Sequence, residues 1–168
     1  MGLLISNSDF IGKYKVSTNS FTASVLTDFT TQYETIYLKE LLGKDLSDLF
    51  IADLTAQAPT TPIYLTLYNY LEVESYNKMY VSQGMKDMML GFIYYEFNRK
   101  DKIKQTINGA VVNQSELSRE AGFTENSITM NYNDSVDYYK TIQMYINDNL
   151  TDYPLFKGLE KQVSHWAI

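Results

Sequence analysis

Few residues in this sequence can carry acid–base chemistry. The chain contains one histidine, His165, and no cysteine. A Ser-His-Asp triad requires an imidazole base, so His165 is the one candidate for that role. It stands close to the end of the sequence, and catalytic groups are rare on chain ends because such ends fray. We therefore predict a surface or packing role for His165, and we expect no catalytic residue.

Paired carboxylates are the second possible source of chemistry. The pairs are Asp45 and Asp48, Glu72 and Glu74, and Asp134 and Asp137. Such pairs can bind a metal ion or divide acid and base roles. No histidine or third carboxylate is set with them, and the glycines form no phosphate-binding loop. Solvated helix starts explain them better, so we expect no metal site, no cofactor and no enzymatic activity.

Composition narrows the class of protein further. The chain has 168 residues, of which 45% are hydrophobic and 20% charged, which is typical of a single globular domain over 1–168. The formal net charge is −6, so we do not expect the protein to bind nucleic-acid phosphates over a wide surface. Without cysteine there are no disulfides or thiolate metal sites. No apolar run is long enough to predict a membrane span.

Hydrophobic periodicity predicts a mainly α fold, a small antiparallel bundle of four to five helices. After an irregular start, the expected helices are 21–42, 45–56, one from 62 that ends or bends at 77–81, 83–100 and 127–149. The expected boundary residues are Ser20 and Gly43 around the first helix, Thr61 and Pro62 at the third, Ser82 at the fourth, and Thr124 or Asn126 at the last. The helical core is therefore 21–100 with 127–149.

Three of these helices have a clear apolar stripe at three- and four-residue spacing. In the first helix the stripe is Val25, Phe29, Tyr33, Ile36, Tyr37 and Leu41. In the fourth it is Met85, Met88, Met89, Phe92, Ile93 and Phe97, with Tyr95 near its edge. In the last it is Ile128, Tyr132, Val136, Tyr139, Ile142, Tyr145 and Ile146. Gly91 predicts a close approach of a neighbouring helix.

The sequence pattern changes after the fourth helix. Residues 101–126 are predicted to form an arm followed by a loop. Asn108-Gly109 between β-branched residues indicates a hairpin, or a single strand kinked at the glycine. Such an arm finds few partners on its own small domain, so we predict that it contacts a neighbouring subunit. The predicted subunit-interface residues are Ile103, Thr106, Ile107, Gly109, Val111 and Val112. The basic residues Arg99, Lys100, Lys102 and Lys104 would touch phosphate, contact an acidic neighbour or cap the helix.

Two further features suggest contacts with other molecules. The chain has fifteen tyrosines, a residue type enriched where proteins meet, although tyrosines also line wet cores. The tail 150–168 turns at Tyr153-Pro154 and then offers an apolar patch. The predicted tail-docking residues are Leu155, Phe156, Leu159 and Trp166.

Four stretches carry a family resemblance: ISNSDFIGKY (5–14), YLKELLG (37–43), GMKDMMLGFIYYEF (84–97) and TINGAVV (106–112). With them the chain resembles the head–tail connector proteins (also called adaptor, ring or neck proteins) of tailed bacteriophages. It is most similar to versions from phages of Bacteroidetes, including crAss-like phages. The resemblance covers most of the chain, and its motifs are fold signals rather than catalytic ones.

The resemblance implies a helical bundle with one protruding arm. It implies a homo-oligomeric ring, commonly a dodecamer, in the virion neck, assembled in the host cytoplasm. The implied partners are the portal and other neck or tail proteins, with DNA passing through the lumen without specific binding. Ring closure requires heterologous contacts, which an arm supplies by strand addition. The alternative function is a monomeric, non-enzymatic adaptor that binds a phage or host protein through a tyrosine-rich surface.

Overall fold

The computed structural model describes residues 2–16, 20–101, 103–106, 109–112 and 118–158. Within this part of the chain five α-helices form a small bundle, which confirms the mainly α fold with a β arm. They are α1 (Ser20–Leu42), α2 (Lys44–Ala52), α3 (Pro62–Tyr68), α4 (Met85–Asp101) and α5 (Ser118–Asp148). Two short 3-10 helices, η1 (Asn7–Asp9) and η2 (Gly12–Tyr14), precede them.

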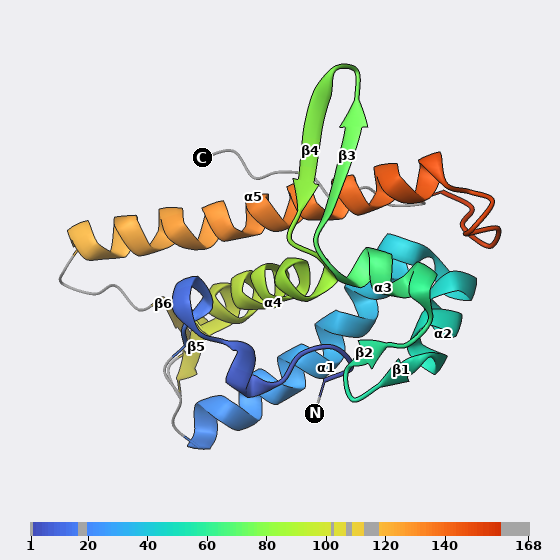
Figure 1. The fold of residues 1–168 in the computed structure, drawn as a ribbon. Coiled ribbons are helices and arrows are strands. Elements are labelled where there is room, and N and C mark those ends of the chain that lie inside the picture. Colours follow the sequence, from blue (N-terminus) through green and yellow to red (C-terminus); the bar gives the residue numbers. More distant parts are fainter. Residues whose placement is uncertain (1, 17–19, 102, 107–108, 113–117, 159–168) are drawn as a thin grey trace.

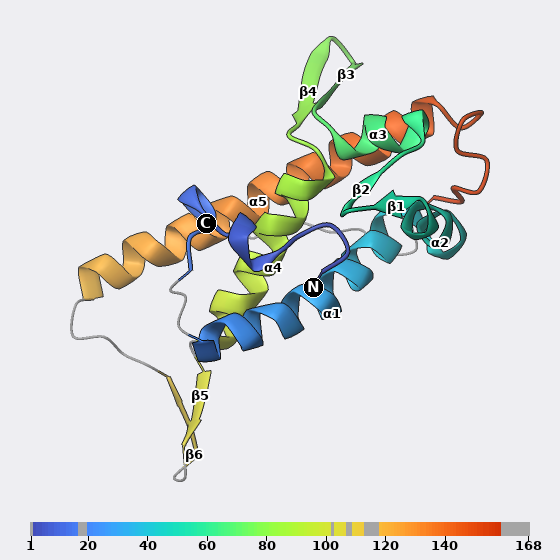
Figure 2. The same cartoon turned by 60° about the horizontal axis from the view of Figure 1, so that its bottom comes forward.

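The described strands form antiparallel hairpins. They are β1 (Leu54–Thr55) with β2 (Ala58–Pro59), β3 (Leu71–Ser75) with β4 (Lys78–Ser82), and β5 (Ile103–Thr106) with β6 (Gly109–Val112). The first pair is a minimal turn beside α2. The other two leave the helical body, as Figures 1 and 2 show, and we call β3–β4 the first arm and β5–β6 the second arm.

Helix α4 forms the centre of the bundle, in contact with both α1 and α5 (Figure 1). Every member of its predicted apolar stripe is buried, from Met85 to Phe97, and Tyr95 lies at the edge as expected. Gly91 faces α5 so closely that a side-chain carbon there would lie 2.0 Å from Oγ of Ser135. The same carbon would lie 2.8 Å from the carbonyl oxygen of Asn131. The predicted close approach of a neighbouring helix at Gly91 is confirmed.

Helix α1 spans the predicted range, but its most buried line differs from the predicted stripe. Tyr37 and Leu41 are buried as expected, whereas Ile36 is exposed. The fully or nearly fully buried line runs at four-residue spacing through Leu26, Thr30, Glu34, Leu38 and Leu42. Two members of this line, Thr30 and Glu34, are polar, so a search for apolar residues at helical spacing does not find it. They are buried because residues 2–16, here called the N-terminal strap, cover that side of α1 (Figure 1).

The strap is held by the Glu34 carboxylate. Its Oε1 accepts hydrogen bonds from the backbone N–H groups of Leu4, at 2.9 Å, and Ile5, at 2.7 Å, and its Oε2 accepts one from Leu3. Burial raises the pKa of Glu34 above its ordinary value, although the three N–H groups act in the opposite direction. At the other end of the strap, Tyr14 packs in the core. The irregular start of the chain is therefore part of the core.

The predicted third helix is wrong beyond its first two turns. Thr61 and Pro62 start it as expected, but it ends at Tyr68, and Asn69 is extended. Residues Leu71–Ser75 then alternate between buried apolar and exposed polar positions with the period of two that a strand needs. The chain becomes the first arm, and Ser82 ends β4 instead of capping α4.

Two other helix boundaries also differ from prediction. Helix α2 ends at Ala52, before the predicted 56, and its Leu49 is exposed. Helix α5 begins at Ser118, so Thr124 and Asn126 lie inside it rather than cap it, and much of the predicted loop 113–126 is helical. Its predicted inward residues are buried, with Tyr145 partly so, which confirms the stripe. Gly43 has a positive φ of 75° between α1 and α2, as its predicted role at the helix end requires.

Candidate functional site

The first arm is anchored at its base. Its register pairs Leu71 with Ser82 and Val73 with Tyr80, and these residues share the inward face of the ribbon. Leu71, Val73 and Ser82 are buried, and both strands contact α5. The base of the first arm is therefore part of the hydrophobic core, which fixes the direction in which the arm leaves the body (Figure 1).

The tip of the first arm is exposed. Tyr76 and Asn77 form the turn, with φ values of 51° and 58°, which are the two positive values that a type I′ turn requires. Tyr76 is 96% exposed and Met79 is 58% exposed. A large aromatic side chain and a flexible thioether on the end of an anchored hairpin form a surface suited to protein contact.

The outward face of the first arm is acidic. Glu72 and Glu74 alternate along β3 on this face, opposite Val81 and Met79, and both carboxylates are exposed. Tyr70, which is 52% exposed, donates its hydroxyl hydrogen to Glu72. The outward face therefore combines two carboxylates with the apolar side chains of Met79 and Val81.

Most of the fifteen tyrosines lie in the core or pack against it. Seven are buried, namely Tyr14, Tyr37, Tyr64, Tyr94, Tyr132, Tyr139 and Tyr153, and five more are partly buried against the core. Tyr139 and Tyr153 donate to the carbonyl oxygens of Glu40, at 2.8 Å, and Ile63, at 2.7 Å, and burial raises both phenol pKa values. Tyr70 and Tyr76 are the exposed tyrosines, and both belong to the first arm or its approach. A tyrosine surface, which the adaptor alternative requires, is thus confined to this arm.

The second arm is a hairpin, which decides between the two conformations that the sequence left open. Its register pairs Ile103 with Val112, Lys104 with Val111 and Thr106 with Gly109. Figure 2 shows both strands extending away from the helical body. Of the predicted interface residues, Ile107 lies outside the described residues. The subunit contact itself stays a prediction.

The two arms leave opposite ends of α4. The first arm ends at Ser82, shortly before Met85 begins the helix, and the second begins at Ile103, shortly after Asp101 ends it. A helix of 17 residues is about 25 Å long. Figure 2 shows the arms pointing to opposite sides of the molecule. One buried helix thus sets the positions of both arms.

Basic residues gather where α4 meets the second arm. Arg99 lies in the last turn of α4, and the sequence places Lys100 beside it and Lys104 in β5. Nη2 of Arg99 lies 2.7 Å from Oε2 of Glu96, and the Arg99 side chain is 51% exposed. Lys102 lies outside the described residues. Part of this basic group therefore binds a carboxylate of its own chain and still faces solvent.

Two of the four predicted tail-docking residues, Leu155 and Phe156, belong to the described part of the chain. Phe156 is 6% exposed and packs in the core of its own chain, so it offers little surface for docking, and its docking role stays a prediction. Leu155 is exposed. Leu159 and Trp166 lie outside the described residues. Tyr153, which begins the turn, anchors the tail in the core beside Phe156.

The acidic pair Asp45 and Asp48 binds lysines. Asp45 lies 3.2 Å from Nζ of Lys157, and Asp48 lies 3.0 Å from Nζ of Lys44. Among the described residues, no group of three or more potential ligand side chains could hold a metal ion. His165 lies outside this part of the chain. Every described helix is too short or too polar to cross a bilayer.

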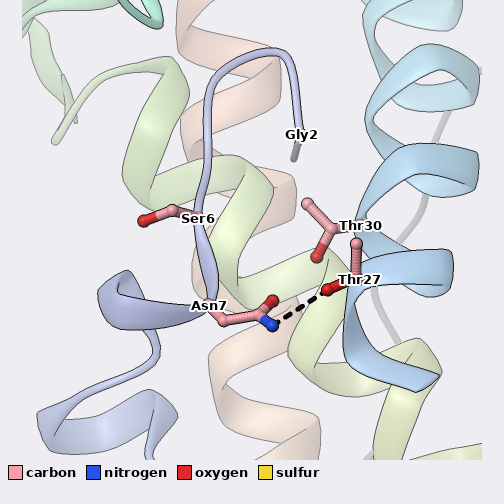
Figure 3. Close-up of a pocket in the computed structure, with 5 residues that line it drawn as sticks. All are labelled: Gly2, Ser6, Asn7, Thr27 and Thr30. Atoms are coloured by element: carbon pink, nitrogen blue, oxygen red, sulfur yellow. Dashed lines mark hydrogen bonds between the residues drawn. The ribbon is translucent and has the colours of Figure 1, made fainter. Parts of the chain in front are cut away.

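A pocket of about 280 Å³ lies between the strap and α1 (Figure 3). Its lining residues are Gly2, Ser6, Asn7, Thr27 and Thr30. Nδ2 of Asn7 donates to Oγ1 of Thr27 and to the carbonyl oxygen of Ala23, both at 2.9 Å. These side chains are neutral and bonded within the chain, so they position the strap and offer no acid–base pair.

Comparisons with known proteins give no relative. No protein-family model matches the chain, and neither a curated protein nor a solved structure does.

Proposed function

We propose that this protein is a non-enzymatic structural subunit of an oligomeric ring, of the kind found in the neck of tailed bacteriophages between portal and tail. The observation that carries the proposal is the placement of two hairpin arms at opposite ends of one buried helix. The sequence resemblance to head–tail connector proteins supports the same function.

Ring closure explains why two different arms are useful. A ring is built from heterologous contacts, in which one surface of each copy meets a different surface of the next. Two-stranded hairpins also leave backbone N–H and C=O groups unpaired along both edges, and such edges accept another strand. The second arm, with Ile103, Thr106, Ile107, Gly109, Val111 and Val112, is the proposed intersubunit contact.

The charge of the chain suits a channel for DNA. With a net charge of −6, the wall of such a ring attracts the phosphate backbone weakly or repels it. DNA then passes through the lumen without being held. The ring, commonly a dodecamer in proteins that this chain resembles, would dock to the portal and to other neck or tail proteins.

A monomeric adaptor is the second candidate function. The specific observation in its favour is the tip of the first arm, where Tyr76 is 96% exposed. An adaptor would use this tip to bind a phage or host protein and would not need the second arm for any contact between copies. The two functions therefore predict different results when the second arm is removed.

The decisive experiment deletes residues 104–114. We expect a helical monomer with a cooperative unfolding transition that no longer joins rings, as measured by circular dichroism, sedimentation and negative-stain imaging of reconstituted necks. The matched control is Leu49→Ser, which changes an exposed apolar residue on α2, away from both arms. Normal assembly of the deletion variant would contradict the role of the second arm as the intersubunit contact, whereas a function retained by a protein that never forms rings would favour the monomeric adaptor.

A further inference from the structure

We infer that the outward face of the first arm, formed by Glu72, Glu74, Met79 and Val81, contacts the basic end of α4 and the second arm in the adjacent copy of the same chain. This inference rests on the proposed ring function. It deepens that function by naming both halves of the contact between copies.

Among the described residues, the carboxylates of the outward face have no basic partner. The opposite face of the same ribbon packs on α5 through Leu71 and Val73. Glu72 bonds to Tyr70, and neither Glu72 nor Glu74 makes an ion pair within the described residues. Met79 adds a large exposed apolar side chain beside Glu74. Carboxylates next to exposed apolar surface favour a partner that is basic and partly apolar.

The outward face and the segment 99–104 are complementary in charge. The chain carries a net charge of −6, so most of its surface repels another acidic face. The sequence concentrates basic residues at 99–104, with Arg99, Lys100, Lys102 and Lys104 against the one carboxylate of Asp101, and β5 and β6 contain the β-branched residues Ile103, Val111 and Val112. The end of α4 and the second arm thus provide both properties that the outward face requires.

The positions of the two surfaces also favour a contact between copies. The acidic face and the basic group belong to opposite ends of α4, which are about 25 Å apart by helix length. They point to opposite sides of the molecule (Figure 2), so they cannot meet within one copy. Two complementary surfaces on opposite sides of one subunit give a head-to-tail contact, which propagates around a closed ring.

Disulfide trapping tests the contact directly, because the chain has no cysteine of its own. A disulfide requires Cα atoms within about 7 Å, so a bond between positions 74 and 104 can form only between copies. In assembled rings we expect Glu74→Cys with Lys104→Cys to give a ladder of covalent multimers on non-reducing gels. Each single variant can give dimers at most. Asp148→Cys with Lys104→Cys is the matched control, since Asp148 is exposed at the far end of α5.

Charge reversal gives an independent test. Glu72→Lys with Glu74→Lys should weaken assembly about tenfold or more, and so should Lys100→Glu with Lys104→Glu, because like charges then meet. Combining all four substitutions should restore assembly, since the attraction is re-formed with opposite signs. Asp148→Lys with Asp152→Lys makes the same change of net charge as the Glu72 and Glu74 variant, but elsewhere, and should leave assembly within about twofold of the unmodified protein.

The outcomes separate this inference from the function on which it rests. Rings that form normally but give no ladder beyond dimers would overturn the inference and leave the ring function standing. Failure of the fourfold variant to recover would also overturn the inference, because the two faces would then have other partners. Absence of rings from the unmodified protein would overturn the ring function itself.

Discussion

The two arms of this molecule are both antiparallel hairpins, yet they are stabilised differently. The first arm has its base in the hydrophobic core and a turn, Tyr76-Asn77, with no glycine. The second arm pairs Gly109 of β6 with Thr106 of β5, so Gly109 lies in a strand although the sequence marks Asn108-Gly109 as a turn, and its strands leave the body (Figure 2). The comparison teaches that burial at the base fixes the register of a hairpin, whereas a turn signal in the sequence shows where a hairpin forms and leaves its register open.

The first test removes the anchor of the first arm and compares its cost in stability with that of the same change in the second arm. Leu71→Ala is expected to lower the free energy of unfolding by about 2–5 kcal/mol, because it leaves a cavity against α5. The corresponding base substitution in the second arm, Ile103→Ala, should cost less than about 0.5 kcal/mol. Urea denaturation of both variants measures the difference. Equal costs would show that the second arm also packs on its own body.

The second test displaces the helix that both arms share. Gly91→Ala puts a carbon 2.0 Å from Oγ of Ser135, and we expect a loss of about 1–3 kcal/mol in the free energy of unfolding. Adding Ser135→Ala removes the clashing oxygen and should recover part of that loss. Thermal and urea unfolding measure both variants. No loss in the single variant would mean that α4 and α5 are not in close contact.

The third test changes the turn chemistry of the first arm. Replacing Tyr76-Asn77 by Asn-Gly introduces the sequence preferred in two-residue hairpin turns, and glycine accepts the positive φ of 58° without strain. We expect a gain of roughly 1 kcal/mol in the free energy of unfolding, because asparagine tolerates the left-handed φ of 51° at position 76 better than tyrosine does. Assembly should weaken, because the exposed aromatic ring at the tip is removed. A loss of stability would indicate that Tyr76 contributes contacts within its own chain.

The smallest effect concerns the short β1–β2 turn, which a side chain holds closed. Asp53 accepts hydrogen bonds from the N–H of Thr61 and that of Thr60, each at 2.8 Å. These bonds, with those from both threonine hydroxyls, lower the pKa of Asp53 to about 2. The folded-state pKa lies below the ordinary value of 3.8, so the contribution to stability is present above pH 3.8 and is lost as pH falls through about 2.

Acid titration of the folded protein, followed by circular dichroism, checks this expectation against Asp53→Ala. The variant should be slightly less stable near neutral pH and should show a flatter decline between pH 4 and 2 than the unmodified protein. Identical acid profiles would show that Asp53 does not hold the turn.

Sequence reasoning succeeded where one local signal dominated. The stripes of α4 and α5 are apolar along their length, and the prediction of close packing at Gly91 needed only a missing side chain on an inward face. The change of residue type after α4, together with Asn-Gly, marked the position of the second arm, which is half of the candidate site. Only the structure decided that this arm is a hairpin and that Gly109 lies in β6, opposite Thr106.

Sequence reasoning failed where a distant contact overrode local preference. Leu71 and Val73 continue the helical spacing of α3, so the strand pattern after Tyr68 was read as helix. Glu34 looks like a solvent-facing residue until the strap brings three backbone N–H groups to it. The tyrosines could not be divided into core and surface by composition, since both locations favour the same side chain.

By itself, the sequence determined the helical class, the central apolar helix, the position of the second arm and the lack of cysteine chemistry. These features depend on periodicity, residue type and the preferences of adjacent residues, all of which act over short distances along the chain. Only the tertiary structure decided that Leu71 and Val73 belong to an anchored hairpin, that Glu34 holds the strap and that the two arms lie on opposite sides of the molecule. Those outcomes depend on which segments become buried together, and burial is a property of the assembled fold.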